Sequence, residues 1–353
     1  MRLAAVTLLI ALGALAAPAA AATVARRTPA VGPVFAGAKV AWGEETRAGG
    51  VRIRTGTPVA TVHRVPAPTA RRTDRGFFHT PWSLAASGTH LAAIVHTSTV
   101  TQSGPDFVST TSTSAAIGGA FGALGLLAGS LPARGDAACD GTRRSPEAVA
   151  VDGDRIAFAE LTFDCDLPET RSEITISGGG ATTTVVAAEN ARVVQLRLAG
   201  RHLAWVVNDR RLVVRDLLTN AETTLTRFTI GDLDVDPEGR VAFTFSRNAG
   251  PRRLAILEAG RLRVLDRRVA DRGVALAAGR VLYEKLDRGD FRSRLLVRGL
   301  AGGTRRLATF TPRRRRIGGL DLDATRAAWA TLPTRPGYEG RPTGPARIIS
   351  RRL

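Results

Sequence analysis

Cysteine, lysine and aromatic residues are scarce in this chain of 353 residues. Aromatic side chains make up only 5% of the sequence, so Val, Leu and Ala must fill most of a core. Among 50 basic residues, only Lys39 and Lys285 are lysines, and the other 48 are arginines. No stretch beyond the N-terminus sustains helical periodicity, while runs rich in β-branched residues favour strands, so the sequence predicts an all-β fold.

Motifs that carry enzyme chemistry are also missing. The sequence has no Gly-x-Ser-x-Gly elbow, no His-Glu-x-x-His pair, no phosphate loop and no dinucleotide fingerprint. Its five histidines lack the spacing of metal ligands. We therefore expect no cofactor, no metal and no locally encoded catalytic residue.

The N-terminus has the three parts of a secretory signal. Met1-Arg2 supplies positive charge, the run 3–15 is apolar, and Ala20-Ala21-Ala22 offers small residues for cleavage. The alternative is a membrane anchor, but the run is short for a bilayer span. We expect residues 1–22 to be removed and the mature chain to be secreted or periplasmic, without stable membrane insertion because no second apolar stretch approaches spanning length.

One short phrase recurs seven times along the chain: a basic residue, an aliphatic residue, a small or aliphatic residue, and usually an aromatic. Six copies follow a Gly by one or two places, where a tight turn needs it. The last four copies are 38, 40 and 46 residues apart, a period typical of propeller blades. The copies of this anchor phrase are Lys39-Val40-Ala41-Trp42, His90-Leu91-Ala92-Ala93, Arg155-Ile156-Ala157-Phe158, His202-Leu203-Ala204-Trp205, Arg240-Val241-Ala242-Phe243, Arg280-Val281-Leu282-Tyr283 and Arg326-Ala327-Ala328-Trp329.

Each anchor phrase is interpreted as the second strand of a four-stranded blade, which predicts a seven-bladed β-propeller. The seventh blade lacks its outer strand, and residues 22–28 are free to supply it and so remove an open sheet edge. The predicted domain is a single propeller over 23–353. Its blades are expected at about 29–66, 77–131, 146–188, 191–228, 230–269, 272–310 and 316–353 together with 22–28.

Two copies of the phrase carry a family resemblance. The stretches Gly153-Asp154-Arg155-Ile156-Ala157-Phe158 and Asp236-Pro237-Glu238-Gly239-Arg240-Val241-Ala242-Phe243 resemble the Asp-Gly-x-x-Ile-Ala-Phe phrase of TolB-type, WD-repeat-like propellers. The chain departs from WD-repeat proteins because no Gly-His or Trp-Asp pair marks its blades. The resemblance implies an exported propeller used for protein contact, and it carries over no catalytic residue.

The two cysteines fall in loops that a propeller would place on one face. Cys139 precedes the third blade, and Cys165 follows that blade's second strand. In an oxidising compartment we expect a Cys139–Cys165 disulfide, worth roughly 3 kcal/mol on the chain-entropy model. A metal pair lacks support because no His lies nearby. Asp140, Asp164 and Asp166 could gather calcium, but they match no ligand template.

The same face should carry Arg313, Arg314, Arg315 and Arg316, in the loop that enters blade seven. They could form an anion-binding patch at the rim of the channel, or simply a solvated loop. The basic position of the anchor phrase has two similar interpretations. It could form a ring of cations around a site, or each side chain could lie along its sheet with its head in water, which we favour.

The leading hypothesis is an exported, non-enzymatic propeller that binds a partner protein or an envelope polyanion through its loop-rich face. We expect a monomer that does not meet nucleic acid. The alternative is a propeller hydrolase, lyase or lactonase in the central channel, and a third is a sensory or structural ectodomain. A channel site would draw on inner-strand acids, and the candidates are Asp232, Asp234, Asp321 and Asp323.

Overall fold

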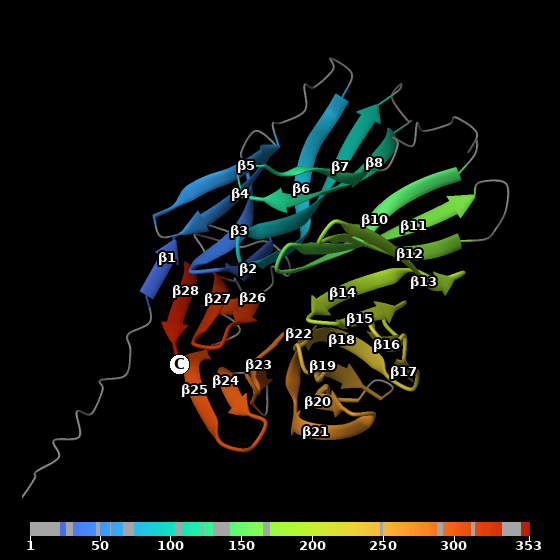
Figure 1. Cartoon of the computed structure of the whole chain (residues 1–353). Helices are drawn as coiled ribbons and strands as arrows, with labels where there is room; N and C mark the ends of the chain where they lie inside the picture. The colour runs from blue at the N-terminus through green and yellow to red at the C-terminus, as the bar shows by residue number, and fades with distance from the viewer. Residues whose placement is uncertain are drawn as a thin grey trace, which may run out of the picture.

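The protein is a ring of seven four-stranded antiparallel sheets (Figure 1). The computed structural model describes residues 22–25, 31–46, 50–56, 58–65, 74–102, 108–121, 123–129, 142–164, 170–247, 250–287, 292–311, 315–333 and 347–353. These residues contain no helix, and therefore none long and apolar enough to cross a membrane. The predicted all-β, seven-bladed propeller is confirmed.

The strands follow the chain from the inside of each blade outward, except in the last blade. Blade 1 has β2 (Val31–Ala36), β3 (Lys39–Glu45), β4 (Val51–Gly56) and β5 (Ala60–Val65). Blade 2 has β6 (Asp74–Ser87), β7 (His90–Gln102), β8 (Val108–Ala120) and β9 (Gly125–Gly129). Blade 3 has β10 (Thr142–Asp152), β11 (Arg155–Asp164), β12 (Thr170–Gly178) and β13 (Ala181–Glu189).

The second half of the ring repeats this order. Blade 4 has β14 (Val193–Ala199), β15 (His202–Val207), β16 (Arg211–Asp216) and β17 (Glu222–Leu225). Blade 5 has β18 (Thr229–Val235), β19 (Val241–Ser246), β20 (Arg253–Glu258) and β21 (Arg261–Arg267). Blade 6 has β22 (Val269–Ala277), β23 (Arg280–Leu286), β24 (Ser293–Gly299) and β25 (Thr304–Phe310). Blade 7 has β26 (Arg315–Leu322), β27 (Arg326–Pro333), β28 (Arg347–Arg352) and β1 (Ala22–Ala25).

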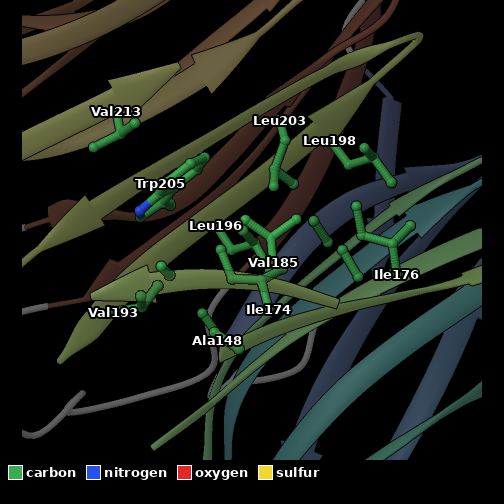
Figure 2. Close-up of a cluster of buried hydrophobic side chains, with 14 of the residues drawn as sticks. Ala148, Ile174, Ile176, Val185, Val193, Leu196, Leu198, Leu203, Trp205 and Val213 are labelled. Carbon is green, nitrogen blue, oxygen red and sulfur yellow. The ribbon is translucent and has the colours of Figure 1, made fainter. Parts of the chain in front are cut away.

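The anchor phrases lie on the second strands because these strands are covered on both faces by neighbouring blades. All six residues of β19 are buried. The aromatic residues of the phrase are the largest buried side chains, with Trp42, Phe243 and Tyr283 at most 1% exposed. Figure 2 shows one of the resulting cores, where Trp205 and Leu196 of blade 4 pack with Ile174 of blade 3. Each core lies between two blades, so no blade can bury its apolar surface alone.

The two ends of the chain close the ring in one sheet, as expected. In blade 7, β1 pairs antiparallel with β28, with Thr23 opposite Ile349 (Figure 1, blue beside red). The innermost strands β2 and β26 also lie side by side. A small core joins blade 1 to blade 7 and contains Phe35, Trp42 and Ile348. The described part of the ring therefore has no gap between the first and last blades.

In three copies of the anchor phrase, the basic residue binds the next blade. Arg326 of blade 7 donates to the carbonyl oxygens of Gly37 and Ala38 in blade 1, at 2.7 and 2.6 Å, and its guanidinium lies 4.5 Å from the Phe35 ring centroid. Similarly, Arg155 donates to the Gly200 carbonyl, and Arg280 to the Ala324 carbonyl.

These acceptors all belong to the turn between the first two strands of the next blade. In these three blades, the guanidinium group of the anchor-phrase arginine binds the next blade. The expectation that it lies in water is therefore wrong for these copies. The turns collect on one end of the ring, which we call the turn face. The loops between second and third strands, and between blades, lie at the opposite end, the loop-rich face.

Blade 2 is larger than the repeat pattern indicated. β6, β7 and β8 have 14, 13 and 13 residues, about twice the length of most other strands. The Ala/Gly-rich stretch of this blade forms the antiparallel pair β8 and β9. The extra length lies toward the loop-rich face, because the turn-face end of β6 and β7 stays in register with the other blades.

A chain that begins at residue 29 tests the closure. Loss of β1 removes its pairing with β28 and exposes a sheet edge, so we expect the free energy of unfolding to fall by about 3 kcal/mol, at about 1 kcal/mol per backbone hydrogen bond. Urea unfolding of this chain against one beginning at residue 22 measures the change. Equal midpoints of unfolding would show that β1 does not stabilise the ring.

Candidate functional site

The inner strands set one ring of residues beside the central channel. In every blade, one inner-strand residue lies opposite the third residue of the anchor phrase. Most members are small or apolar, and the three charged members come from blades 4, 5 and 7. In blade order, the ring consists of Val34, Ala85, Ala150, Arg197, Asp234, Ala275 and Asp321.

The carboxylates near the channel bind backbone N–H groups of the following blade. Asp234 of β18 accepts from Leu276 N at 2.7 Å, and Asp232 accepts from Gly273 N at 2.8 Å. Asp321 of β26 accepts from Phe35 N, across the seam between blades 7 and 1. An inner strand has a free edge whose N–H groups need acceptors. These acids supply them, so holding blades together accounts for their positions.

Arg197 balances part of this negative charge. Its guanidinium lies 3.5 Å from Asp232 and 3.8 Å from Asp234, whose side chains are 20% and 21% exposed. Burial raises the pKa of Asp234 to about 6, against the opposing effects of Arg197 and of two N–H donors. Burial, together with the charge of Asp234, raises the pKa of Asp321 to about 7. Asp234 and Asp321 therefore stay protonated to higher pH than exposed aspartates do.

The fourth predicted channel acid has a different place. Asp323 lies in the turn between β26 and β27, where its carboxylate accepts from Thr325 N at 2.7 Å and from Arg326 N at 2.6 Å. Burial alone would raise the pKa of Asp323, but these hydrogen bonds and the Arg326 guanidinium outweigh it and lower the pKa. This acid orders a turn and orients Arg326, and it does not belong to the channel.

Most site residues predicted on the loop-rich face lie outside the described part of the chain. This holds for Arg313, Arg314, Cys139 and Cys165. The structure therefore does not test the disulfide. The backbones of Arg315 and Arg316 begin β26 and pair with Pro333 and Leu332, so the inner strand starts earlier than the expected loop allowed. The calcium candidates Asp140 and Asp166 are also outside the description, and of Asp164 only the backbone is described.

A groove that the sequence did not indicate runs along the seam between blades 5 and 6, from Arg268 and Asp287 at the loop-rich end to Arg298 and Thr304 beside the turn between β24 and β25. It consists of two adjoining cavities of about 490 and 660 Å³ that share Asp266, Lys285 and Arg294. This size suits a small ligand or one unit of a polymer. We call it the blade 5–6 groove. Its polar lining residues are Asp266, Arg267, Arg268, Tyr283, Lys285, Asp287, Arg294, Arg298, Thr304 and Arg306.

A compact network forms the floor of the groove around one carboxylate. Asp266 accepts from Lys285 Nζ at 2.6 Å, from the Tyr283 hydroxyl at 2.7 Å and from Arg267 N at 2.7 Å. Burial alone would raise the pKa of Asp266, but the hydrogen bonds from Lys285 and Tyr283 outweigh it and lower the pKa. Burial and the carboxylate raise the pKa of Tyr283. The floor therefore consists of a Lys285–Asp266 ion pair with no net charge, to which the Tyr283 hydroxyl donates a hydrogen bond.

Positive charge is in excess on the walls. The lining has six basic and two acidic side chains, which leaves four positive charges. Arg294 pairs with Asp287, and Arg298 donates to the Leu265 carbonyl. Among the described residues, no carboxylate lies within 4.0 Å of Arg267, Arg268 or Arg306, and all three are exposed. These guanidinium groups are available to an anionic ligand.

The groove could not be predicted from the sequence because no local motif encodes it. Its residues come from two blades and span 266 to 306. One signal was present: Lys285 is one of the two lysines in the chain, and it follows a buried tyrosine by two places on the same face of a strand. Lys285 and Tyr283 form a polar site only together with Asp266, which the neighbouring blade contributes.

No protein-family model and no curated protein sequence matches the chain. Among solved structures, TolB from Acinetobacter baumannii is 12% identical with a TM-score of 0.42, covering 72% of this chain and 61% of its own. An acylaminoacyl peptidase from Pyrococcus horikoshii is 12% identical with a TM-score of 0.49, covering 86% of this chain. The chain aligns with only half of that peptidase (50%).

A third similar structure is the WD40 domain of Pan2 from Neurospora crassa. It is 10% identical with a TM-score of 0.42, and the match covers 94% of this chain and 89% of that domain. At such identities and TM-scores, these similarities support no inference about activity, substrate or partner. The propeller fold itself rests on the seven sheets and their closure.

The raised pKa of Asp321 predicts how stability changes with pH. The carboxyl titrates near 3.9 when unfolded and at about 7 when folded, so the folded state holds the proton more tightly. Its contribution is fully present below about pH 4 and is lost as pH rises through about 7. We expect Asp321→Asn to reduce the fall in unfolding free energy between pH 5 and pH 8, measured by urea unfolding.

A matched variant at Asp323 serves as the control. Its lowered pKa leaves this carboxylate ionised in both states above about pH 5, so Asp323→Asn should lower stability without altering the slope over the same range. An unchanged slope in Asp321→Asn would contradict the assignment of that titration.

Proposed function

We propose that the protein is an exported propeller that binds an anionic polymer of the cell envelope through its loop-rich face. The blade 5–6 groove is the observation that carries this proposal. One of its two cavities lies at that face, and the groove has four positive charges in excess and three guanidinium groups free of carboxylate partners within the described chain. Because such groups attract anions over about 10 Å at about 0.1 M salt, and farther at lower salt, they favour a polyanion over a neutral partner.

The predicted secretory segment 1–22 supports the envelope as the place where the protein works. The formal net charge is +19 for the full chain and +18 once Arg2 is removed with the signal, and an exported chain of this charge meets anionic polymers there rather than nucleic acid. We further propose that Arg313–Arg316, which lead into blade 7, extend the basic surface on the same face. The Cys139–Cys165 disulfide would hold loops of blade 3 on that face.

The channel offers less to the alternative of a hydrolase, lyase or lactonase. Asp232, Asp234 and Asp321 already accept N–H groups from neighbouring blades. A general acid or base must reach a substrate proton, and these carboxylates face backbone instead. A partner protein with an acidic surface is the second candidate, since the same free guanidinium groups would suit it.

Binding to immobilised dextran sulfate, with uncharged dextran as the reference matrix, tests the proposal. We expect retention on the sulfated matrix only, and apparent affinity should fall at least about tenfold as salt rises from low to high concentration, because the contacts are electrostatic. Replacing Arg267 and Arg268 by Ala should weaken retention. Surface plasmon resonance measures both effects.

Arg201→Ala provides the control, because this exposed arginine lies on the turn face and carries the same charge. It should bind like the unmodified protein. Equal loss in the Arg201 variant would mean that net charge, not the loop-rich face, drives binding. Equal retention on both matrices would contradict the proposal itself.

A further inference from the structure

We infer that the blade 5–6 groove is a binding site for a phosphate group, carried by the anionic ligand. This inference rests on the proposed function and narrows it to one ligand chemistry at one site. It depends on how the basic side chains are placed on two facing walls, and on the floor between them.

One wall of the groove, together with Tyr283 and Lys285 of the floor, comes from a single face of blade 6. Side chains directly across neighbouring strands share a face, so the pairing register defines rows. Lys285 lies opposite Arg294 in one row, and Tyr283 lies opposite Leu296, which in turn lies opposite Arg306, in the next. Cationic side chains thus flank a row whose inner members are buried.

The facing wall is the outer strand of blade 5. β21 contributes Asp266 and Arg267, and Arg268 follows at the connection into blade 6. Leu296 of the opposite wall and Leu265 of this one close the bottom of the groove with apolar surface. Arg268 and Arg306 line different cavities of the groove, and Arg294 lines both, so a ligand meets Arg294 together with one of the other two.

This arrangement favours phosphate over carboxylate. A phosphate monoester carries up to two charges and three acceptor oxygens in a tetrahedral array, so it can accept from facing walls at the same time. A carboxylate is planar and presents its two oxygens in one plane, which a single guanidinium fork satisfies. With four excess positive charges on two walls, the groove matches the larger and less planar anion.

The floor network leaves these cations free for the ligand. Lys285 and the Tyr283 hydroxyl both donate to Asp266, so this carboxylate is compensated from within the protein. It neither repels the ligand as an isolated charge would nor competes for Arg267 and Arg306.

Calorimetric titration of the full chain with glycerol phosphate and with malonate tests the inference. Both probes are small dianions, but glycerol phosphate carries a tetrahedral phosphate group whereas malonate carries two planar carboxylates. We expect one glycerol phosphate per chain, with malonate at least about tenfold weaker. Arg306→Ala should weaken glycerol phosphate about tenfold, as expected for one charged hydrogen bond. Arg306→Lys, which keeps the charge but loses the fork, should recover only part of the affinity.

Arg201→Ala is again the control and should bind glycerol phosphate normally, and thermal unfolding of each variant checks that it folds. Malonate binding as tightly as glycerol phosphate would overturn the phosphate assignment. Retention on dextran sulfate without glycerol phosphate binding, or binding that Arg306→Ala leaves unchanged, would overturn the groove as the site while leaving the proposed function intact. Failure to bind any anion would overturn both.

Discussion

Contact between each blade and the next is the constraint on which this protein depends. No blade buries its apolar face alone, because each hydrophobic core draws on two consecutive sheets. A ring satisfies this condition for every blade only if the last meets the first. The pairing of β1 with β28, and the packing of Trp42 against Ile348, meet it by joining the two ends of the chain.

Polar residues reinforce the same seams on two levels. Near the channel, Asp232, Asp234 and Asp321 accept backbone N–H groups from the following blade. On the turn face, Arg155 and Arg326 donate to carbonyl groups of the following blade. Acids thus serve exposed donors and arginines serve exposed acceptors, so much of the charge near the axis is structural. The need of buried N–H groups for acceptors therefore explains the channel aspartates, which by position alone resemble catalytic residues.

The seam between blades 5 and 6 departs from the pattern in its outer half. Close to the axis it is apolar, with Val274, Leu276 and Val281 in one core. Farther out, Lys285 and Asp266 lie on the facing surfaces of the two sheets, and an open groove lined by charged side chains takes the place of a core. A buried ion pair stabilises less than apolar packing of the same volume. A role in binding gives a reason for a polar interior at this seam.

The sequence by itself determined the number of blades and the second strands, because these depend on patterns within some forty residues. It also indicated the closure, because counting strands left the seventh blade one short and residues 22–28 without a partner. The apolar anchor phrase is buried wherever a strand is covered on both faces, and Gly37 or Gly153 marks the turn before it. Only the tertiary structure decided which charges are structural and which are free. Asp323 proved to order a turn, Arg326 to join two blades, and Arg306 to face an open groove. The partners of these side chains lie on another blade or across a turn, so no local spacing records them.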